Sequence, residues 1–115
     1  MTFIEAFEKI KSATAKSNAE SINGDLALQI ELTDPDAAGI LYFEVKDGRL
    51  RVEPYDYVDR DASIKILSKD LLRILSGRIG YDKAVENQLA TVEGNALKAL
   101  EIKKLVVRPQ KKKNQ

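Results

Sequence analysis

One stretch of the chain specifies how its own strands pair. In residues 40–54, "ILYFEVKDGRLRVEP", an Asp–Gly pair separates two runs that are rich in strand-forming residues. An Asp–Gly pair in this setting is a strong signal for a two-residue β-hairpin loop. With Asp47 and Gly48 in the loop, Lys46 pairs with Arg49 and the apolar residues of both strands meet on one face. The side chains predicted to face the core are Leu41, Phe43, Val45, Leu50 and Val52.

Three other segments have the pattern of β-strands. Residues 26–33, "LALQIELT", place leucine or isoleucine at every second position, which is typical of a strand with one buried face. Residues 62–67, "ASIKIL", and residues 89–94, "LATVEG", are shorter runs of the same kind. The turn residues "DPDAAG" at 34–39 separate the first strand from the hairpin.

The helical spacing of apolar residues predicts four helices. They are expected at residues 2–17, between Ser68 and Gly77, at residues 81–88 and at residues 96–105. Thr2, Ser68 and Asn95 are the expected N-caps, because their side chains accept hydrogen bonds from free backbone amides. Gly77 is the expected C′ residue, since glycine readily adopts the left-handed conformation needed there.

The order of these elements is helix, four strands, two helices, strand and helix. It predicts an α+β fold, in which about four helices cover one face of a five-stranded, largely antiparallel sheet. A chain of 115 residues has the usual length of one domain with one core. We therefore expect one domain at residues 1–107 and a basic flexible tail at residues 108–115.

The chain contains no cysteine and no histidine. These counts exclude disulfides, thiol nucleophiles, Cys or His zinc sites and Ser-His-Asp triads. A non-catalytic protein without a metal or a cofactor is therefore favoured. Four of the 19 basic residues lie in the tail, whereas all 18 acidic residues precede it. The body has no basic excess, so a nucleic-acid partner is not expected.

No segment of the sequence has the pattern of a membrane span or a secretion signal. The longest uninterrupted apolar run is "ILYF", far below the roughly 20 residues of a spanning helix. Charged residues interrupt the N-terminal helix, and the sequence ends in "KNQ" rather than a peroxisomal tripeptide. A cytoplasmic location is the default expectation.

Residues 61–100 contain several short motifs in a characteristic order. An acidic residue precedes an "I-x-I" strand, a serine opens a helix that ends near a glycine, and a short helix and a second strand follow. The matching residues are Asp61, Ile64, Ile66, Ser68, Leu72, Leu75, Gly77, Arg78, Ile79, Ala84, Val92, Gly94 and Leu97. Together with the first helix and the hairpin, residues 3–105 resemble the sterol carrier protein type 2 domain family, in its stand-alone prokaryotic-type form. Two positions depart from the pattern: the usual glycine is missing at residues 87–88, and Asn95 replaces a common aspartate.

The resemblance implies that the helices and the sheet enclose an apolar tunnel for a sterol, a fatty acyl chain or another hydrophobic ligand. Such a site needs a concave, mostly apolar surface and no catalytic group. The residues expected to line the tunnel are Phe3, Phe7, Phe43, Leu71, Leu72, Leu75, Ile79, Tyr81, Val85, Leu97 and Leu100. The same apolar helix faces would also serve an ordinary filled core, and both interpretations stay open.

Three polar features also have two interpretations. Tyr81 follows a corner bracketed by Gly77 and Gly80 and would suit a ligand head group, although turn geometry alone explains both glycines. The acidic loop around residues 53–61 lacks the ligand spacing of a calcium loop, so a solvated loop is favoured over a cation site. The lysines at 111–113 suggest a transient membrane-surface contact, but a solubilising tail is favoured.

Two functions compete with lipid carrying. An accessory module would use the same apolar groove to receive a helix of a partner protein. A small enzyme would have to use Asp59 and Asp61 with Tyr55 or Tyr57, and this is the least favoured hypothesis. The sequence leaves the identity of the ligand and the oligomeric state open.

Overall fold

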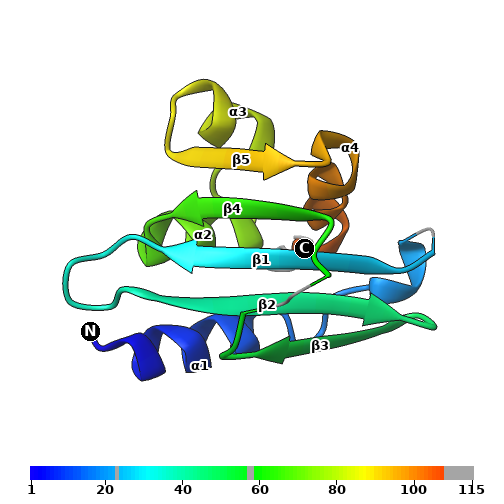
Figure 1. Cartoon of the computed structure of the whole chain (residues 1–115), viewed down its shortest axis with the longest axis horizontal. Coiled ribbons are helices and arrows are strands. Elements are labelled where there is room, and N and C mark those ends of the chain that lie inside the picture. The colour runs from blue at the N-terminus through cyan, green and yellow to red at the C-terminus, as the bar shows by residue number, and fades with distance from the viewer. Residues whose placement is uncertain (23, 57–58, 108–115) are drawn as a thin grey trace, which may run out of the picture.

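The computed structural model describes residues 1–22, 24–56 and 59–107, and its centre is one five-stranded sheet (Figure 1). The strands are β1 (Leu26–Leu32), β2 (Gly39–Lys46), β3 (Arg49–Glu53), β4 (Ala62–Ile66) and β5 (Ala90–Gly94). Their order across the sheet is β3-β2-β1-β4-β5. All neighbours are antiparallel except β1 and β4, which are parallel. The predicted α+β fold is confirmed, with a mixed sheet in which antiparallel pairs predominate.

The hairpin has the register that the sequence predicts. Lys46 pairs with Arg49, and the apolar residues of β2 and β3 pair on one face. Asp47 and Gly48 have φ angles of 55° and 76°. Two positive φ angles in a two-residue loop are characteristic of the type I′ turn, whose twist matches that of the strands.

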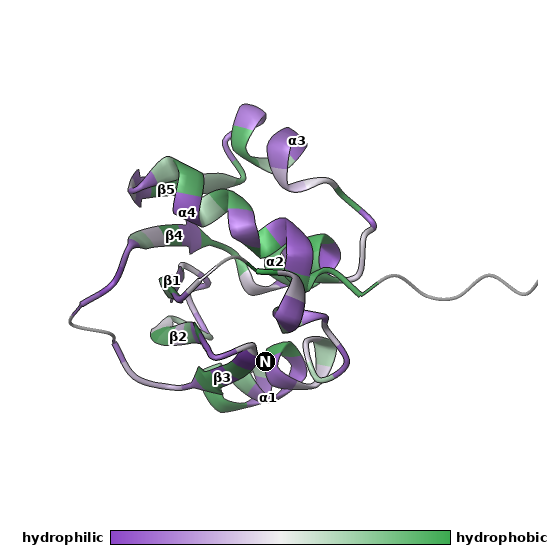
Figure 2. Ribbon diagram, turned by 90° about the vertical axis from the view of Figure 1, so that its right-hand side faces the viewer, coloured by the Kyte–Doolittle hydropathy of each residue, from purple (hydrophilic) through white to green (hydrophobic). Residues whose placement is uncertain are grey.

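The helices lie on one side of the sheet (Figure 2). The α-helices are α1 (Phe3–Ala13), α2 (Ser68–Leu75), α3 (Tyr81–Glu86) and α4 (Ala96–Ala99). Two 3₁₀ helices complete the set: η1 (Ala19–Ser21) and η2 (Leu100–Leu105). None of the described helices is long and apolar enough to cross a membrane.

The first helix begins as predicted but ends earlier. Thr2 is its N-cap, and Thr2 and Glu5 form a reciprocal capping box. The helix ends at Ala13 and not at residue 17. Thr14 donates its hydroxyl back to the carbonyls of Ile10 and Lys11, at 3.3 and 3.1 Å. Such local bonding offers the chain an alternative to continuing the helix.

The prediction of one last helix at residues 96–105 is wrong in its geometry. Asn95 does cap α4, because its side chain accepts a hydrogen bond from the Lys98 amide at 3.1 Å. However, α4 covers one turn and then tightens into η2. The buried residues there are Ala99, Ile102 and Leu105. Their spacing of three matches the three residues per turn of a 3₁₀ helix.

The prediction that Ser68 is the N-cap of α2 is also wrong. Leu67 occupies the cap position, and its side chain makes no capping hydrogen bond. The carboxylate of Asp34, from the loop between β1 and β2, accepts hydrogen bonds from the amide and the hydroxyl of Ser68, both at 2.8 Å. The free amide at the start of the helix is therefore satisfied by a residue distant in sequence.

The end of α2 confirms the predicted role of Gly77, whose φ angle is 78°. The Arg78 amide bonds to the Arg73 carbonyl at 2.8 Å, and the Gly77 amide bonds to the Ile74 carbonyl at 3.0 Å. These two bonds define a Schellman motif. The chain is thereby turned sharply toward α3.

Candidate functional site

The helix-covered face of the sheet is a continuous apolar layer. Each strand contributes alternate residues to it, as strand geometry requires. The buried strand residues on this face are Leu26, Leu28, Ile30, Leu32, Leu41, Phe43, Val45, Val52, Ala62, Ile64, Ile66 and Ala90. The helices supply the opposite wall with Ala6, Phe7, Ile10, Leu71, Ile74, Leu75, Tyr81, Ala84, Ala99, Ile102 and Leu105. A hydrophobic ligand held by this fold would have to enter this layer or its edges.

The structure brings most of the predicted tunnel residues to this layer. The buried ones are Phe7, Phe43, Leu71, Leu75 and Tyr81. Three more pack against the layer and are partly buried: Phe3, Leu72 and Ile79. The remaining three lie at the surface, with exposed fractions of 36% for Val85, 76% for Leu97 and 36% for Leu100. Leu100 begins η2, which buries Ile102 and Leu105 instead, and Leu97 lies in α4, which buries Ala99 instead.

The first helix forms its part of the wall with two aromatic rings. Phe3 and Phe7 are stacked, with ring centroids 6.4 Å apart. The Phe3 ring lies so close to Gly39 of β2 that a Cβ there would be within 2.4–2.8 Å of the ring atoms. Lys11 covers the Phe7 ring, with its Nζ 5.7 Å from the centroid. The aromatic side chains are thus held between helix and sheet.

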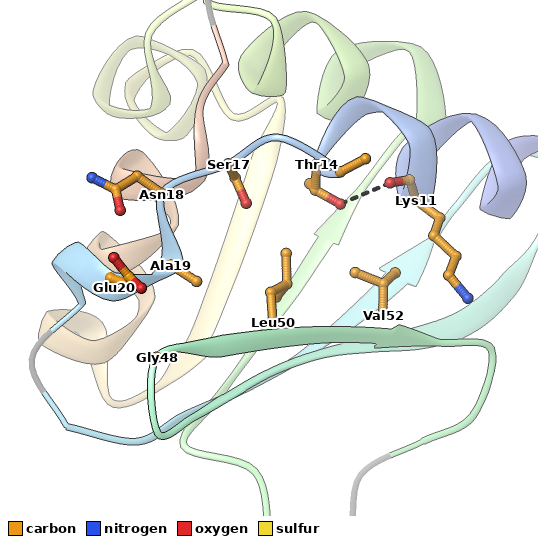
Figure 3. Close-up of a pocket in the computed structure, with 10 residues that line it drawn as sticks. Lys11, Thr14, Ser17, Asn18, Ala19, Glu20, Gly48, Leu50 and Val52 are labelled. Carbon is orange, nitrogen blue, oxygen red and sulfur yellow. Dashed lines mark hydrogen bonds between the residues drawn. The ribbon is translucent and has the colours of Figure 1, made fainter.

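One opening lies between the C-terminal end of α1 and the edge strand β3, and we call it the edge pocket (Figure 3). Its volume is about 430 Å³. Leu50 and Val52 point into it from β3, opposite Thr14 and Ser17 (Figure 3). Its lining residues are Lys11, Thr14, Ala15, Ser17, Asn18, Ala19, Glu20, Gly48, Leu50 and Val52. The two apolar side chains also contact the core, so the pocket adjoins the apolar layer.

A second opening, the corner pocket, lies where α2, α3 and the end of η2 meet. Its volume is about 330 Å³, and it is lined by Ile74, Gly77, Ile79, Gly80, Tyr81, Lys103 and Val106. The Val107 amide bonds to the Leu75 carbonyl at 2.8 Å, which holds the chain after η2 against the end of α2. This pocket contains the corner and the tyrosine to which the sequence drew attention.

The pKa values of three side chains are shifted, and none of the three belongs to a group arranged like a catalytic site. Hydrogen bonds from the Thr2 amide and hydroxyl lower the pKa of Glu5, and the N-terminal ammonium lowers the pKa of Asp36. Burial, helped by the charge of Asp82, raises the pKa of Tyr81. The first two shifts belong to helix capping and a surface ion pair. Neither pairs a nucleophile with a base.

The acidic loop has a structural role at its end. The carboxylate of Asp61 accepts a hydrogen bond from the Ala27 amide at 2.8 Å, which ties the loop to β1. Within residues 1–22, 24–56 and 59–107, no group of three or more acidic side chains is arranged to hold a metal ion. Tyr57, which the enzyme hypothesis invoked, lies outside the described residues.

The edge pocket was missed by the sequence analysis. Leu50 and Val52 were predicted as core residues, and residues 14–17 were assigned to the first helix. The only local signal is the break "SNAESINGD" that begins at residue 17, which indicates an irregular segment but not its position. A pocket formed by such a segment and a distant edge strand depends on tertiary packing, which residue types alone do not reveal.

The fold and the apolar layer define a small α+β domain whose helices and sheet enclose an apolar interior. Residues 3–107 match the model of a family described as the SCP-2 sterol transfer family. The chain belongs to this family, which confirms the resemblance noted in the sequence. No match was found among curated proteins.

Solved structures share this fold at low sequence identity. Sterol carrier protein 2 like 2 from Aedes aegypti aligns with a TM-score of 0.63 and 14% identity, over 87% of this chain and 92% of that chain. Sterol carrier protein 2 from the same organism, in complex with palmitate, aligns with a TM-score of 0.60 and 15% identity, over 93% and 96%. At these identities the likeness shows the fold alone.

The same fold also occurs inside an enzyme. The inverting sec-alkylsulfatase Pisa1 from Pseudomonas sp. aligns with a TM-score of 0.62 and 15% identity. The match covers 87% of this chain but only 14% of the sulfatase chain. Domains of this fold therefore exist both in small carrier proteins and as parts of larger ones.

Proposed function

We propose that the protein binds or carries a lipid, without catalysis, by burying its apolar chain between the helices and the sheet. The observation that carries this proposal is the continuous apolar layer, which adjoins open pockets at the edge and at the corner. Membership of the SCP-2 sterol transfer family supports it. A relative of the same fold is known in complex with palmitate, which supports an acyl chain as one ligand.

Burial of apolar groups alone can supply the free energy of such binding, without polar contacts. Burial contributes about 0.8 kcal/mol for each methylene group removed from water. A long acyl chain therefore supplies on the order of 10 kcal/mol before the costs of association and ordering. The interior is filled by side chains such as Leu71 and Leu75, which are fully buried. A ligand that enters this layer would therefore have to displace some of these side chains.

The test is titration of the purified chain with a fluorescent fatty acid, after organic extraction of any lipid that co-purifies. Leu50 is partly buried, lies at the edge pocket and packs against the core. Leu50→Asp should weaken probe binding about tenfold or more, because a carboxylate in the entry path must be desolvated. Circular dichroism and thermal unfolding check that the variant folds.

Leu97→Asp is the matched control, since it introduces the same charge at a leucine that is 76% exposed. It should leave both the fold and probe binding unchanged. Absence of probe binding to the wild-type protein at micromolar concentration would contradict the carrier function. Equal binding by wild type and a folded Leu50→Asp variant would contradict entry at the edge pocket.

An accessory role is the second candidate. It is favoured by the sulfatase, in which the same fold occupies a small part of a longer chain. In this role the apolar groove would receive a helix of a partner protein instead of a lipid. A defined partner that binds the lipid-free protein, and is not displaced by fatty acid, would favour this function over carrying.

Three further expectations belong to the proposal. The stand-alone prokaryotic type, the cytoplasmic location and membrane contact through the basic tail stay predictions. The tail, residues 108–115, lies outside the described residues. A tail deletion that leaves binding to vesicles of phosphatidylserine and phosphatidylcholine unchanged would contradict the membrane contact.

A further inference from the structure

The sheet has two edge strands, and β5 is the one whose outer edge is accessible. β5 is last in the strand order, so no strand pairs with its outer side (Figure 1). At the other edge, Val52 of β3 is only 4% exposed and lies against the edge pocket. On β5, Val92 is partly exposed and Gly94 is exposed. Because glycine has no side chain, the exposure of Gly94 is exposure of the backbone itself.

The hydrogen bonds between β4 and β5 show which backbone groups of β5 point outward. The Asn95 amide bonds to the Asp61 carbonyl at 2.9 Å, in continuation of the register between these strands. Bonded and non-bonded pairs alternate along an antiparallel ladder. Glu93 therefore bonds to β4, as Asn95 does, whereas the amides and carbonyls of Val92 and Gly94 face the outer edge. No described residue outside the sheet forms a backbone hydrogen bond with these groups.

Free backbone donors and acceptors along an edge strand are a template for an added strand. Natural edge strands often carry lysine or proline, which hinder such pairing, and the β5 sequence "ATVEG" contains neither. On the helix-covered side of the sheet, α3 and α4 pack against β5 (Figure 2). Three exposed apolar residues lie on these helices or directly after them: Val85, Leu97 and Leu100. An added strand with apolar side chains on this side would find apolar surface next to β5.

The charge on the opposite side of β5 favours a basic residue in the added strand. Glu93 is exposed and is the only charged residue of β5. Its neighbour across the ladder is Ser63, which is neutral, and Glu93 forms no ion pair with a described residue. A lysine or arginine placed opposite Glu93 would complete a cross-strand charge pair. β5 of a second copy of this chain cannot supply that pair, because it contains no basic residue.

We propose that the outer edge of β5 binds an extended segment of another protein as an added antiparallel strand. The segment has apolar residues at alternate positions and a basic residue opposite Glu93. Backbone hydrogen bonds supply affinity in this mode of recognition, and the alternate side chains supply selectivity. The surface differs from both pockets described above, so the proposal does not depend on the carrier function.

The probe is a synthetic peptide with blocked ends, Ser-Val-Lys-Val-Thr-Val-Ser, whose lysine lies opposite Glu93 when its central valine pairs with Val92. NMR titration of the ¹⁵N-labelled protein measures its binding. The amide signals of Val92 and Gly94 should shift, with a Kd of about 1 mM or tighter. Glu93→Lys should weaken binding about three- to tenfold, because it turns an attractive pair into a repulsive one. The same variant should bind the peptide with glutamate in place of lysine as tightly as the wild type binds the lysine peptide.

Glu8→Lys is the matched control, since it makes the same charge change at an exposed residue of α1 and should leave the binding of both peptides unchanged. Absence of shifts at Val92 and Gly94 with about 5 mM lysine peptide would overturn the proposal. Equal binding of the lysine peptide by wild type and Glu93→Lys would overturn the charge pair. Self-association in sedimentation equilibrium that shifts the same two amides and is not displaced by peptide would assign the edge to a second copy instead. Each of these outcomes leaves fatty-acid binding as a separate question.

Discussion

Two residues of the family-like motif, Asp61 and Gly94, contact one another at one corner of the sheet. The Asp61 carbonyl accepts a hydrogen bond from the Asn95 amide at 2.9 Å, and its own amide donates to the Ala27 carbonyl at 2.7 Å. Gly94 has a φ angle of 95°, a backbone conformation that residues other than glycine rarely adopt. The motif therefore combines a residue that joins β1, β4 and α4 with a glycine that permits the close approach.

Gly94→Ala tests the close contact between Gly94 and Asp61. An added Cβ would lie 2.8 Å from the Asp61 carbonyl oxygen and 3.0 Å from the Ala62 Cα. Backbone strain and this contact together should lower the free energy of unfolding by about 2–3 kcal/mol, measured by urea denaturation. Gly24→Ala is the control, because Gly24 also has a positive φ angle but an added Cβ there would have no described atom within 4 Å. A loss at Gly94 no larger than that at Gly24 would contradict the role of the close contact.

At the scale of elements, helix α2 depends on a contact that sequence patterns do not show. Ser68 has the residue type of an N-cap, and so the sequence pointed to it. The true partner of the first helical amide is Asp34, 34 residues earlier in the chain. Local propensity recognises side chains that suit a cap but cannot recognise one supplied by another loop. The same limit applies to η2, because the residue types of this segment do not show which of them tertiary packing buries, here Ile102 and Leu105.

Asp34→Ala should therefore destabilise the protein although the residue lies outside every helix. The variant loses hydrogen bonds to the amide and hydroxyl of Ser68, a residue that is fully buried. We expect a loss of about 1–3 kcal/mol in the free energy of unfolding, by thermal or urea denaturation. Asp36→Ala, in the same loop, removes only an exposed ion pair with the N-terminus and should change stability little. Similar effects of the two variants would argue against the capping role of Asp34.

The capping box of α1 makes a prediction about pH. The Glu5 carboxylate accepts a hydrogen bond from the Thr2 amide at 2.8 Å, and its pKa is lowered from 4.5. A carboxylate with a lowered pKa in the folded state stabilises the protein above its unfolded pKa and loses this effect as the pH falls through its folded pKa. The stability difference between wild type and Glu5→Ala should therefore be largest near neutral pH and shrink below pH 4.5.

Glu8→Ala provides the control for this pH series, since Glu8 accepts no hydrogen bond from the described residues. Denaturant unfolding at a series of pH values measures both differences. A Glu5→Ala difference that stayed constant from about pH 7 to about pH 3 would show that the carboxylate contributes nothing through its charge.

At the scale of the whole molecule, the sequence predicted the fold class but contained no signal for the edge pocket. Strand alternation and the Asp47–Gly48 turn are local patterns that do not depend on distant contacts. The strand spans and the register of the hairpin could therefore be predicted from them. The placement of the predicted lining residues was mixed: Phe43 and Leu75 lie in the core, whereas Leu97 lies at the surface. A pocket is a property of several elements at once, so the edge pocket had no signature in any one segment.

The proposed function requires that an apolar chain lies between the helices and the sheet. NMR spectroscopy of the protein with 1-dodecanol labelled with ¹³C along its chain measures this contact directly, through intermolecular nuclear Overhauser effects. We expect such effects between the labelled chain and the side chains of Phe43, Leu72 and Leu75, and none to Leu97. Effects confined to Leu97, or none at all with an excess of dodecanol, would contradict the proposed function.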